Sequence, residues 1–293
     1  MKRNCLSFLR TAGLSLALCA TLSGVAAAQG LKTTVSTWEN KLDARIGVIL
    51  RDRSSDWEIS HRADERFPMA STFKTLLCGA ILGRVDAGQE NLTELVSYSK
   101  KDLVSWSPIT KKHVKDGMPV SDLCAAAITM SDNTAANLLL SRVKGPAGLT
   151  GFLRQIGDET TRLDRWEPEL NEATPSDPRD TTSPRAITTS LDRLLFGSAL
   201  QPASAAHLKQ WMIDDKVAGK LIRPHVPKGW IIGDKTGTAG HGTRGIVAFI
   251  QTPEGQTYLA AIYITQSKAD LELRNQVISD IGQAIISEIK ERR

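Results

Sequence analysis

Tyr258-Leu-Ala-Ala-Ile-Tyr-Ile-Thr265 is the stretch of the chain that decides its fold. This run is apolar and rich in β-branched and aromatic residues, but it is too short to cross a membrane as a helix, so it predicts a strand. Residues 230–233 and 245–250 have the same character and are set apart by glycine-rich turns. Residues 271–289 predict a closing helix. The last third of the chain is therefore expected to form three strands followed by a helix.

The N-terminal end supplies further strands. Residues 45–51 and 57–60 are β-rich and flank Ser54-Ser55-Asp56, which predicts a hairpin after a short helix at 35–42. The pattern between the two ends is helical, with helices expected at 72–85, 120–130, 134–143, 146–156, 183–196 and 202–212. We therefore expect an α/β fold in which an antiparallel sheet, built from both termini and flanked by helices, carries an inserted all-α domain.

These patterns also predict the domain boundaries. We expect the α/β domain to comprise residues 29–62 and 213–293 and the all-α domain to comprise residues 63–212, with the active site between the two. The loop at 162–183 is rich in proline and charge, and it is long for a plain connection. Long loops of this kind are often functional.

The segment before residue 29 has the pattern of an export signal. Lys2, Arg3 and Arg10 give it a positive start, an apolar run follows, and Ala26-Ala27-Ala28 supplies the small residues that signal peptidase needs. We expect cleavage after Ala28 and hence a secreted, periplasmic protein without stable membrane association. A retained membrane anchor is the alternative, but the segment is shorter and more polar than a span of about 20 apolar residues. A lipid anchor on Cys19 is a further alternative, which Leu18 fits poorly.

The charge pattern bears on nucleic-acid binding, and the cysteine content bears on a disulfide. The formal net charge is +5, and Lys and Arg are interspersed with Asp and Glu beyond the signal segment, so no basic stripe favours nucleic-acid binding. Removing the signal leaves Cys78 and Cys124, which an exported chain often joins. Closing that loop would lower the entropy of the unfolded chain by roughly 4 kcal/mol at 25 °C. Two buried free thiols are the alternative.

Ser71-Thr-Phe-Lys74 opens the helix expected at 72–85. A serine and a lysine three residues apart lie on one helical face. The ammonium of such a lysine lowers the pKa of the hydroxyl or, when neutral, removes its proton, and the helix N-terminus adds a positive field. Taken alone, the same spacing also fits an N-cap serine beside a solvated lysine.

Two further triplets carry compatible chemistry. Ser131-Asp-Asn133 lies between two expected helices, where its serine could relay a proton and its amide could orient a carbonyl; a plain N-cap cluster is the alternative. Lys235-Thr-Gly237 ends the strand that begins near residue 230. There a cation and a hydroxyl suit an anionic substrate, and glycine permits close backbone approach.

The three triplets occur in order, and S-x-x-K, S-D-N and K-T-G form the signature of class A β-lactamases and penicillin-binding proteins. The similarity to class A β-lactamases extends to Phe67-Pro-Met-Ala-Ser-Thr-Phe-Lys74, Thr129-Met-Ser-Asp-Asn-Thr-Ala-Ala-Asn137 and Arg179-Asp-Thr-Thr182. Arg165-Trp-Glu-Pro-Glu-Leu-Asn171 resembles the segment of that family that borders the active site. The resemblance covers essentially the whole chain after residue 28.

The resemblance implies a mechanism of β-lactam hydrolysis. Ser71 would attack the lactam carbonyl, with the N–H groups of Ser71 and Thr238 as oxyanion hole, and Ser131 would pass a proton to the lactam nitrogen. Glu167 would activate the water that hydrolyses the acyl-enzyme. Whether Lys74 or Glu167 takes the first proton is left open. The implied substrate-binding residues are Trp106, Asn133, Asn171, Lys235, Thr236, Gly237, Thr238 and Arg244.

The resemblance also implies how the loop is built. Glu167 and Asn171 are four apart and would hold one water between them, and the bond before Pro168 is expected to be cis. Arg165 and Asp180 would clamp the ends of the loop. The alternative for that pair is two independent surface charges, worth under about 1 kcal/mol even if paired.

Two rival functions share part of this chemistry. A D-alanyl-D-alanine peptidase would lack the Glu167/Asn171 arrangement, and a non-catalytic β-lactam sensor would need a membrane connection. A metallo-β-lactamase needs clustered histidines, whereas the five here are scattered. We therefore expect no metal, no cofactor, a monomer, and a small-molecule β-lactam as the partner.

The expected substrates are penicillins and some cephalosporins. Residues 151–165 and 195–200 resemble carbenicillin-hydrolysing members, but those commonly carry arginine where this chain has Lys235. An additional hydroxyl at Thr238 favours cephalosporins as a hypothesis. Some carbapenem-hydrolysing relatives have a disulfide at the positions of Ala70 and Ala239, so strong carbapenem turnover is not expected.

Overall fold

The computed structural model describes residue 1 and residues 30–292. The expected signal segment at residues 1–28 and its cleavage site lie almost entirely outside the described residues. Within residues 30–292, none of the helices combines the length and apolarity that a membrane crossing requires.

A five-stranded antiparallel sheet forms the centre of the molecule, in the order β2-β1-β9-β8-β7. Its strands come from the two ends of the chain, as the sequence predicts: β1 (Arg45–Asp52), β2 (Glu58–His61), β7 (Ile231–Ala239), β8 (Thr243–Gln251) and β9 (Thr257–Thr265). The apolar run at 258–265 is the middle strand, and all nine residues of β9 are buried. Its continuous apolar character follows from cover on both faces.

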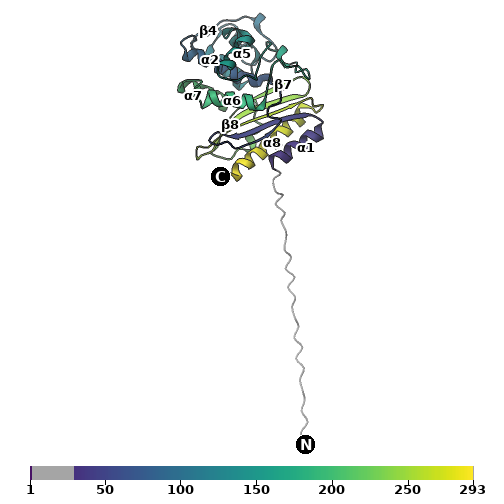
Figure 1. The fold of residues 1–293 in the computed structure, drawn as a ribbon. Coiled ribbons are helices and arrows are strands. Elements are labelled where there is room, and N and C mark those ends of the chain that lie inside the picture. The colour runs from purple at the N-terminus through teal and green to yellow at the C-terminus, as the bar shows by residue number, and fades with distance from the viewer. Residues whose placement is uncertain (2–29, 293) are drawn as a thin grey trace.

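Helices cover both faces of this sheet (Figure 1). One face packs against α1 (Leu31–Leu42) and α8 (Leu271–Glu291), the first and last helices of the described residues, which lie side by side. The other face packs against the helical part of the molecule: α2 (Phe73–Asp86), α3 (Val120–Thr129), α4 (Asn133–Arg142), α5 (Gly145–Gln155), α6 (Pro184–Leu195) and α7 (Pro202–Ile213). The expected fold class is confirmed.

Strand periodicity divides the core between these two layers. In β1, Val48 and Leu50 join the core under α1 and α8, whereas Ile49 between them joins the core shared with the helical part. Successive side chains of a strand point to opposite faces, so one strand serves both cores. The exact division into domains at residues 62 and 213 stays a prediction.

The helical part is organised around α2. Its residues from Phe73 to Leu82 are all buried, and a disulfide joins Cys78 to Cys124 of α3 across a Cα–Cα distance of 5.7 Å. The expected pairing of these cysteines is confirmed. Ser183 caps α6 by accepting from the N–H of Ala186 at 3.1 Å, as Ser-Pro at a helix start predicts.

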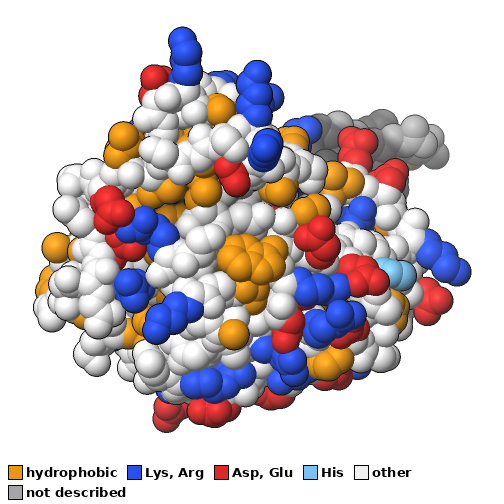
Figure 2. Space-filling model, turned by 90° about the horizontal axis from the view of Figure 1, so that it is seen from above, with side chains coloured by type: hydrophobic (Ala, Val, Ile, Leu, Met, Phe, Trp, Pro, Cys, Tyr) orange, Lys and Arg blue, Asp and Glu red, His pale blue; other side chains and the backbone are white. Residues whose placement is uncertain are grey.

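Several short elements have no counterpart in the sequence analysis. They are the strand pairs β3 (Phe67–Pro68) with β6 (Thr181–Thr182) and β4 (Leu95–Val96) with β5 (Met118–Pro119), and the 3-10 turns η1 (Ala70–Thr72), η2 (Lys100–Asp102), η3 (Thr110–Lys112), η4 (Glu169–Asn171) and η5 (Arg223–His225). Two or three residues are too few to carry a periodic pattern. The surface seen from the helical end mixes cationic and anionic side chains (Figure 2).

Candidate active site

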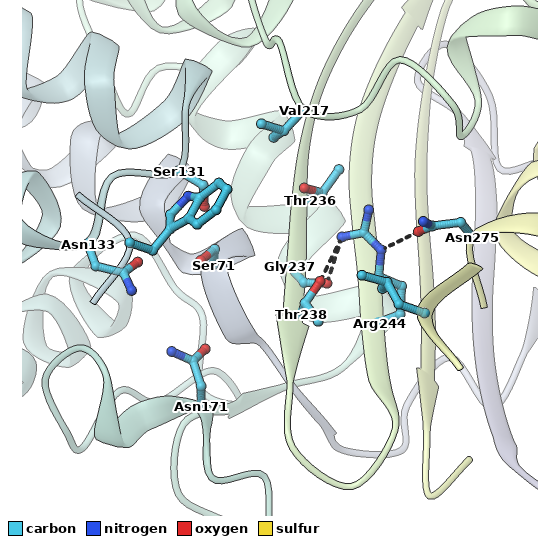
Figure 3. A pocket seen from close by; sticks show the side chains of 12 residues that line it. Ser71, Ser131, Asn133, Asn171, Val217, Thr236, Gly237, Thr238, Arg244 and Asn275 are labelled. Atoms are coloured by element: carbon cyan, nitrogen blue, oxygen red, sulfur yellow. Dashed lines mark hydrogen bonds between the residues drawn. The ribbon is translucent and has the colours of Figure 1, made fainter. Parts of the chain in front are cut away.

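A cavity of about 520 Å³ lies where the helical part meets the edge strand β7. Its size suits a small-molecule ligand. Nine of the residues expected at the site line it, together with three that were not expected to bind substrate (Figure 3). The lining residues are Ser71, Trp106, Ser131, Asn133, Asn171, Val217, Thr236, Gly237, Thr238, Arg244, Leu271 and Asn275.

Ser71 lies in η1, directly before α2, and is 8% exposed. Ala70 before it has a φ of 45°, a left-handed conformation that is strained for alanine. Such strain is typical of backbone held in place by its surroundings at a functional site. Three residues further along, Lys74 donates from Nζ to Ser71 Oγ at 3.1 Å, so the expected pairing on one helical face is present.

The side of the cavity formed by Ser71, Trp106 and the Ser131–Asn133 triplet is called the helical wall. Lys74 is fully buried and connects the polar groups of this wall. Its Nζ donates to Asn133 Oδ1 at 2.6 Å and to Ser131 O at 2.9 Å, and lies 3.0 Å from Glu167 Oε1. Burial lowers the pKa of Lys74, and the charge and hydrogen bond of Glu167 oppose that effect. The lysine is thus a buried ion-pair partner, and the alternative of a solvated lysine is wrong.

The Ser131-Asp-Asn133 triplet both caps a helix and lines the cavity. Asp132 caps α4 by accepting from the Ala135 N–H at 2.9 Å, and it also accepts from the N–H groups of Ile109 and Thr110. Because those bonds fix Asp132 inward, the serine before it and the asparagine after it are presented to the cavity. The helix cap is the support of the site rather than an alternative to it.

Trp106 forms the outer rim of the helical wall. Its side chain is 62% exposed, and its Nε1 donates to Met130 O at 3.1 Å. The backbone carbonyl of Trp106 accepts from the Asn133 N–H at 3.0 Å, and Asn133 Nδ2 donates to Ser105 O at 2.9 Å. The indole therefore offers an open aromatic face that is anchored to the same triplet.

The loop at 162–183 forms the floor of the cavity through Asn171 and brings Glu167 next to that residue. Glu167 is 2% exposed, the Glu167–Pro168 bond is cis as expected, and η4 places Asn171 beside it. Asn171 Nδ2 donates to Glu167 Oε2, while Asn171 Oδ1 is buried without a hydrogen-bond partner among the described residues. The two side chains are thus brought together on one turn.

Two sets of contacts hold this loop. The sequence predicted the first, between Arg165 and Asp180, but not the second, which Asn137 makes. Arg165 Nε donates to Asp180 Oδ2 at 2.6 Å, and Asp180, 1% exposed, also accepts from the N–H groups of Asp164 and Arg165. The alternative of independent surface charges is wrong. Asn137, which was not singled out, accepts from the Glu167 N–H at 3.0 Å and donates to the Glu167 carbonyl at 2.8 Å.

The side of the cavity formed by β7 and β8 is called the sheet wall, and it carries two cationic side chains. Lys235 is fully buried on β7 and donates from Nζ to Ser131 Oγ at 3.1 Å and to Thr236 O at 3.0 Å. On β8, Arg244 lies opposite Thr238 and donates to Gly237 O at 3.0 Å and to Thr238 Oγ1 at 3.1 Å. Burial lowers the pKa of Lys235 to about 7 and that of Arg244 to about 10.

Asn275 of α8 is a site residue that sequence reasoning missed. Its Oδ1 accepts from Arg244 Nε at 2.8 Å, so it orients the guanidinium toward the cavity wall (Figure 3). The position is one turn into an amphipathic helix, where no motif distinguishes it from a surface residue. Leu271 of the same helix and Val217 supply apolar lining.

Two glycines let the walls meet. A Cβ on Gly237 would lie 2.9 Å from Met69 O and 3.0 Å from Ser71 N, so only glycine allows β7 to approach the backbone before α2 this closely. At the end of β7, the Gly240 N–H donates to Asn171 O at 2.8 Å, and a Cβ there would lie 2.3 Å from Glu172 O. The strand end and the loop thus share a hydrogen-bonded seam.

No group of three or more His, Cys, Asp or Glu side chains within residues 30–292 is arranged to hold a metal ion. All the residues expected at the site are brought together: nine line the cavity, and Lys74, Glu167 and Lys235 lie directly behind its surface, in contact with lining residues.

Comparison with known proteins agrees with this arrangement. A model of the beta-lactamase enzyme family matches residues 29–289. Among solved structures, a variant of the class A β-lactamase of the last common ancestor of Gram-negative bacteria is 49% identical, with a TM-score of 0.88, and the match covers 90% of this chain and 100% of that one. The ancestral class A enzyme itself is 50% identical, with a TM-score of 0.86, 88% of this chain covered and 99% of that one. PenP of Rhodopseudomonas palustris, assigned to class A, gives 50%, 0.86, 88% and 99% respectively.

Proposed function

The chain belongs to the class A β-lactamases and is a hydrolase that acts on β-lactams, and from that premise we propose that it opens penicillins through an acyl-enzyme on Ser71. The observation that carries this proposal is the buried cluster around Lys74, whose Nζ contacts Ser71, Ser131 and Glu167 at once. A nucleophile, a proton relay and a carboxylate base are thereby joined through one cation.

Acylation would proceed as follows. Ser71 Oγ bonds to the lactam carbonyl carbon and gives its proton either to Lys74, 3.1 Å away, or through water to Glu167. The N–H groups of Ser71 and Thr238 stabilise the oxyanion. The lactam C–N bond then breaks, and Ser131 delivers a proton to the leaving nitrogen. Lys235 supports that relay, because its Nζ lies 3.1 Å from Ser131 Oγ.

Deacylation would use the floor of the cavity. Glu167 takes a proton from a water that attacks the ester carbonyl, and Ser71 leaves with that proton restored. The buried, unpartnered Oδ1 of Asn171 and the carboxylate of Glu167 supply two polar groups on one turn for such a water. Asn137 supports this step by holding the Glu167 backbone from both sides.

The sheet wall would bind the carboxylate that β-lactam antibiotics carry. Lys235, Thr236 and Arg244 present two cations and a hydroxyl on neighbouring strands, and Asn275 orients the guanidinium. Trp106 would form an aromatic wall across the opening. Turnover of carbapenems is proposed to be slow, because Ala70 and Ala239 cannot form a disulfide.

Thr238 is proposed to favour cephalosporins. Its Oγ1 accepts from Arg244 Nη1, so its own O–H remains free to donate to a substrate oxygen. The test is kcat/KM for a cephalosporin and for benzylpenicillin in the parent and in Thr238→Ala. A drop confined to the cephalosporin is expected, and an unchanged value would remove the hypothesis.

We also propose that the protein is exported, cleaved after Ala28 and active as a periplasmic monomer. N-terminal mass analysis of the protein from a periplasmic fraction, together with sedimentation of the mature form, tests the three points. An N-terminus at Gln29 and a single species of monomer mass are expected.

The decisive experiment is intact-mass spectrometry with benzylpenicillin, alongside a hydrolysis assay, on the parent, Glu167→Ala and Glu169→Ala. Glu169 is an exposed acid two residues along the same loop and serves as the matched control. We expect turnover by the parent and the control, and a one-penicillin adduct on Ser71 in Glu167→Ala. A parent that itself stalls as a stable adduct would instead indicate a penicillin-binding protein or a sensor.

A further inference from the structure

Lys235 differs from the other buried lysine of the site in having no carboxylate against it. Lys74 lies 3.0 Å from Glu167, and Arg223 donates to Asp234 at 2.9 Å. Lys235 is equally buried, yet its Nζ contacts only the neutral groups Ser131 Oγ and Thr236 O, and no ion pair in the described part of the chain includes it. A buried ammonium without an opposite charge is costly.

Asp215 is the converse case, a buried carboxylate with no cation in contact with it among the described residues. It follows α7, is 5% exposed, and takes part in no ion pair within residues 30–292. Its Oδ1 accepts from the N–H groups of Val217 and Ala218, both at 2.7 Å, but its Oδ2 is buried without a hydrogen-bond partner among the described residues. The turn that it holds places Val217 in the cavity wall (Figure 3).

Arg223 joins the segments that carry these two groups, because it donates to Ile213 O at the end of α7 at 3.0 Å and to Asp234 Oδ2 on β7 at 2.9 Å. Asp215 lies two residues after Ile213 and Lys235 directly follows Asp234, so each charge is placed to act on the other. Burial raises the pKa of Asp215, and the positive charge of Lys235 opposes that rise. Burial lowers the pKa of Lys235, and Asp215 is the foremost of the charges that oppose it; Asp234 acts in the same sense, and Lys74 and Arg244 act in the opposite sense. Asp234 already has a cation of its own, because it pairs with Arg223, which is partly exposed.

We propose that Asp215 is a positioning residue for Lys235, keeping its buried ammonium charged from behind the cavity wall without occupying any of its donors. A carboxylate in direct contact would neutralise Lys235 and compete with the carboxylate of the substrate. A carboxylate held further away supports the charge and leaves the ammonium free for substrate and for Ser131. This inference rests on the proposed function, because it deepens the role given to Lys235.

The test compares the parent with Asp215→Asn, which keeps an acceptor oxygen for the Val217 and Ala218 N–H groups. The dependence of KM and kcat for benzylpenicillin on pH is measured. At about pH 8, KM of the variant should exceed that of the parent by roughly 10-fold, because Lys235 loses its proton at lower pH. At about pH 5.5, Lys235 is charged in both proteins and the two KM values should converge. Asp215→Glu should retain the parent profile more closely.

A matched control separates charge support from structure. Asp158→Asn alters a second carboxylate that is 5% exposed and also accepts from backbone N–H groups, but belongs to another region of the fold. It should leave the pH dependence of KM unchanged. A loss in Asp215→Asn that is equal at every pH, or no change at any pH, overturns the inference.

A second measurement does not depend on turnover. In protein labelled with ¹³C at the lysine ε carbons, the Lys235 resonance, assigned with Lys235→Arg, should titrate at lower pH in Asp215→Asn than in the parent. An unchanged titration overturns the inference even where activity is lost through misfolding. A parent that does not hydrolyse benzylpenicillin overturns the proposed function instead, which keeps the two failures distinct.

Discussion

The two walls of the cavity treat buried charge in opposite ways. On the helical wall, Lys74 and Glu167 form an ion pair at 3.0 Å, and Lys74 also meets two serines and an asparagine. On the sheet wall, Lys235 and Arg244 are also buried but contact only neutral groups. A contact ion pair can pass a proton within itself, whereas cations without a carboxylate in direct contact can stabilise an anion that arrives from outside. The difference separates the groups proposed for chemistry from the groups proposed for binding.

The largest effect is expected from removing the nucleophile of the helical wall. Ser71→Ala should lower kcat/KM for benzylpenicillin by about 10⁴–10⁶-fold and abolish the covalent adduct, because the change removes the proposed nucleophilic oxygen. Binding should survive, since the sheet wall is untouched, and this can be measured by calorimetry with the inactive variant. Ser141→Ala, an exposed serine of α4, is the control. An adduct that still forms in Ser71→Ala would place the nucleophile elsewhere.

The second effect comes from forcing the walls apart. Gly237→Ala would put a methyl group 2.9 Å from Met69 O and 3.0 Å from Ser71 N, so β7 or η1 must move. Because the oxyanion hole is proposed to draw one N–H from each wall, kcat should fall by about 10²–10³-fold. Steady-state kinetics checks this against Gly151→Ala, where a Cβ meets nothing within 4 Å. Equal kinetics for the two variants would show that the hole does not span the walls.

A third change tests the sheet wall alone. Arg244→Ala should raise KM for benzylpenicillin by roughly 10- to 100-fold with a smaller change in kcat, since a charged hydrogen bond to the substrate carboxylate is lost. The methyl ester of the same penicillin provides the control, because it has no carboxylate to lose. If the ester suffers as much as the acid, Arg244 supports the wall rather than binding the anion.

The smallest effect is expected at the loop that closes the floor. Asp180→Asn removes a buried charge that meets Arg165 at 2.6 Å, and should lower the free energy of unfolding by about 1–3 kcal/mol. Thermal and urea unfolding measure that change. Arg179→Ala, an exposed neighbour in the same loop, should change neither. If Asp180→Asn is as stable as the parent, Arg165 and Asp180 stabilise the fold no more than two independent surface charges would.

The sequence predicted the parts of the fold that repeat along the chain. The middle strand β9, the cap at Ser183 and the closing helix each carry a periodic or local signal that is read within a few residues. The positions of Ser71, Ser131 and Lys235 at the cavity were predicted because family triplets mark these residues. The cis bond before Pro168 was predicted by resemblance and not by the local residues.

Residues that act across the layers left no such signal. Asn275 orients Arg244 from α8, which covers the sheet face opposite the helical part, and Asn137 holds Glu167 from α4. Asp215 follows a helix with no motif around it, and its proposed role rests on its burial and on a carboxylate oxygen left without a partner among the described residues. Each depends on a distance between segments remote in sequence, which spacing along the chain does not contain.

If the proposed mechanism holds, the hydrogen-bonded seam between Gly240 and Asn171 should couple the range of substrates to the rate of deacylation. The backbone of Asn171 accepts from Gly240, while the side chain of the same residue holds Glu167. A change that widens the opening at the strand end should therefore also move Asn171, which contacts Glu167, the proposed hydrolytic base. Small changes at this seam should therefore alter the range of substrates and the rate of deacylation together. A variant that admits bulkier acyl groups is expected to release them more slowly.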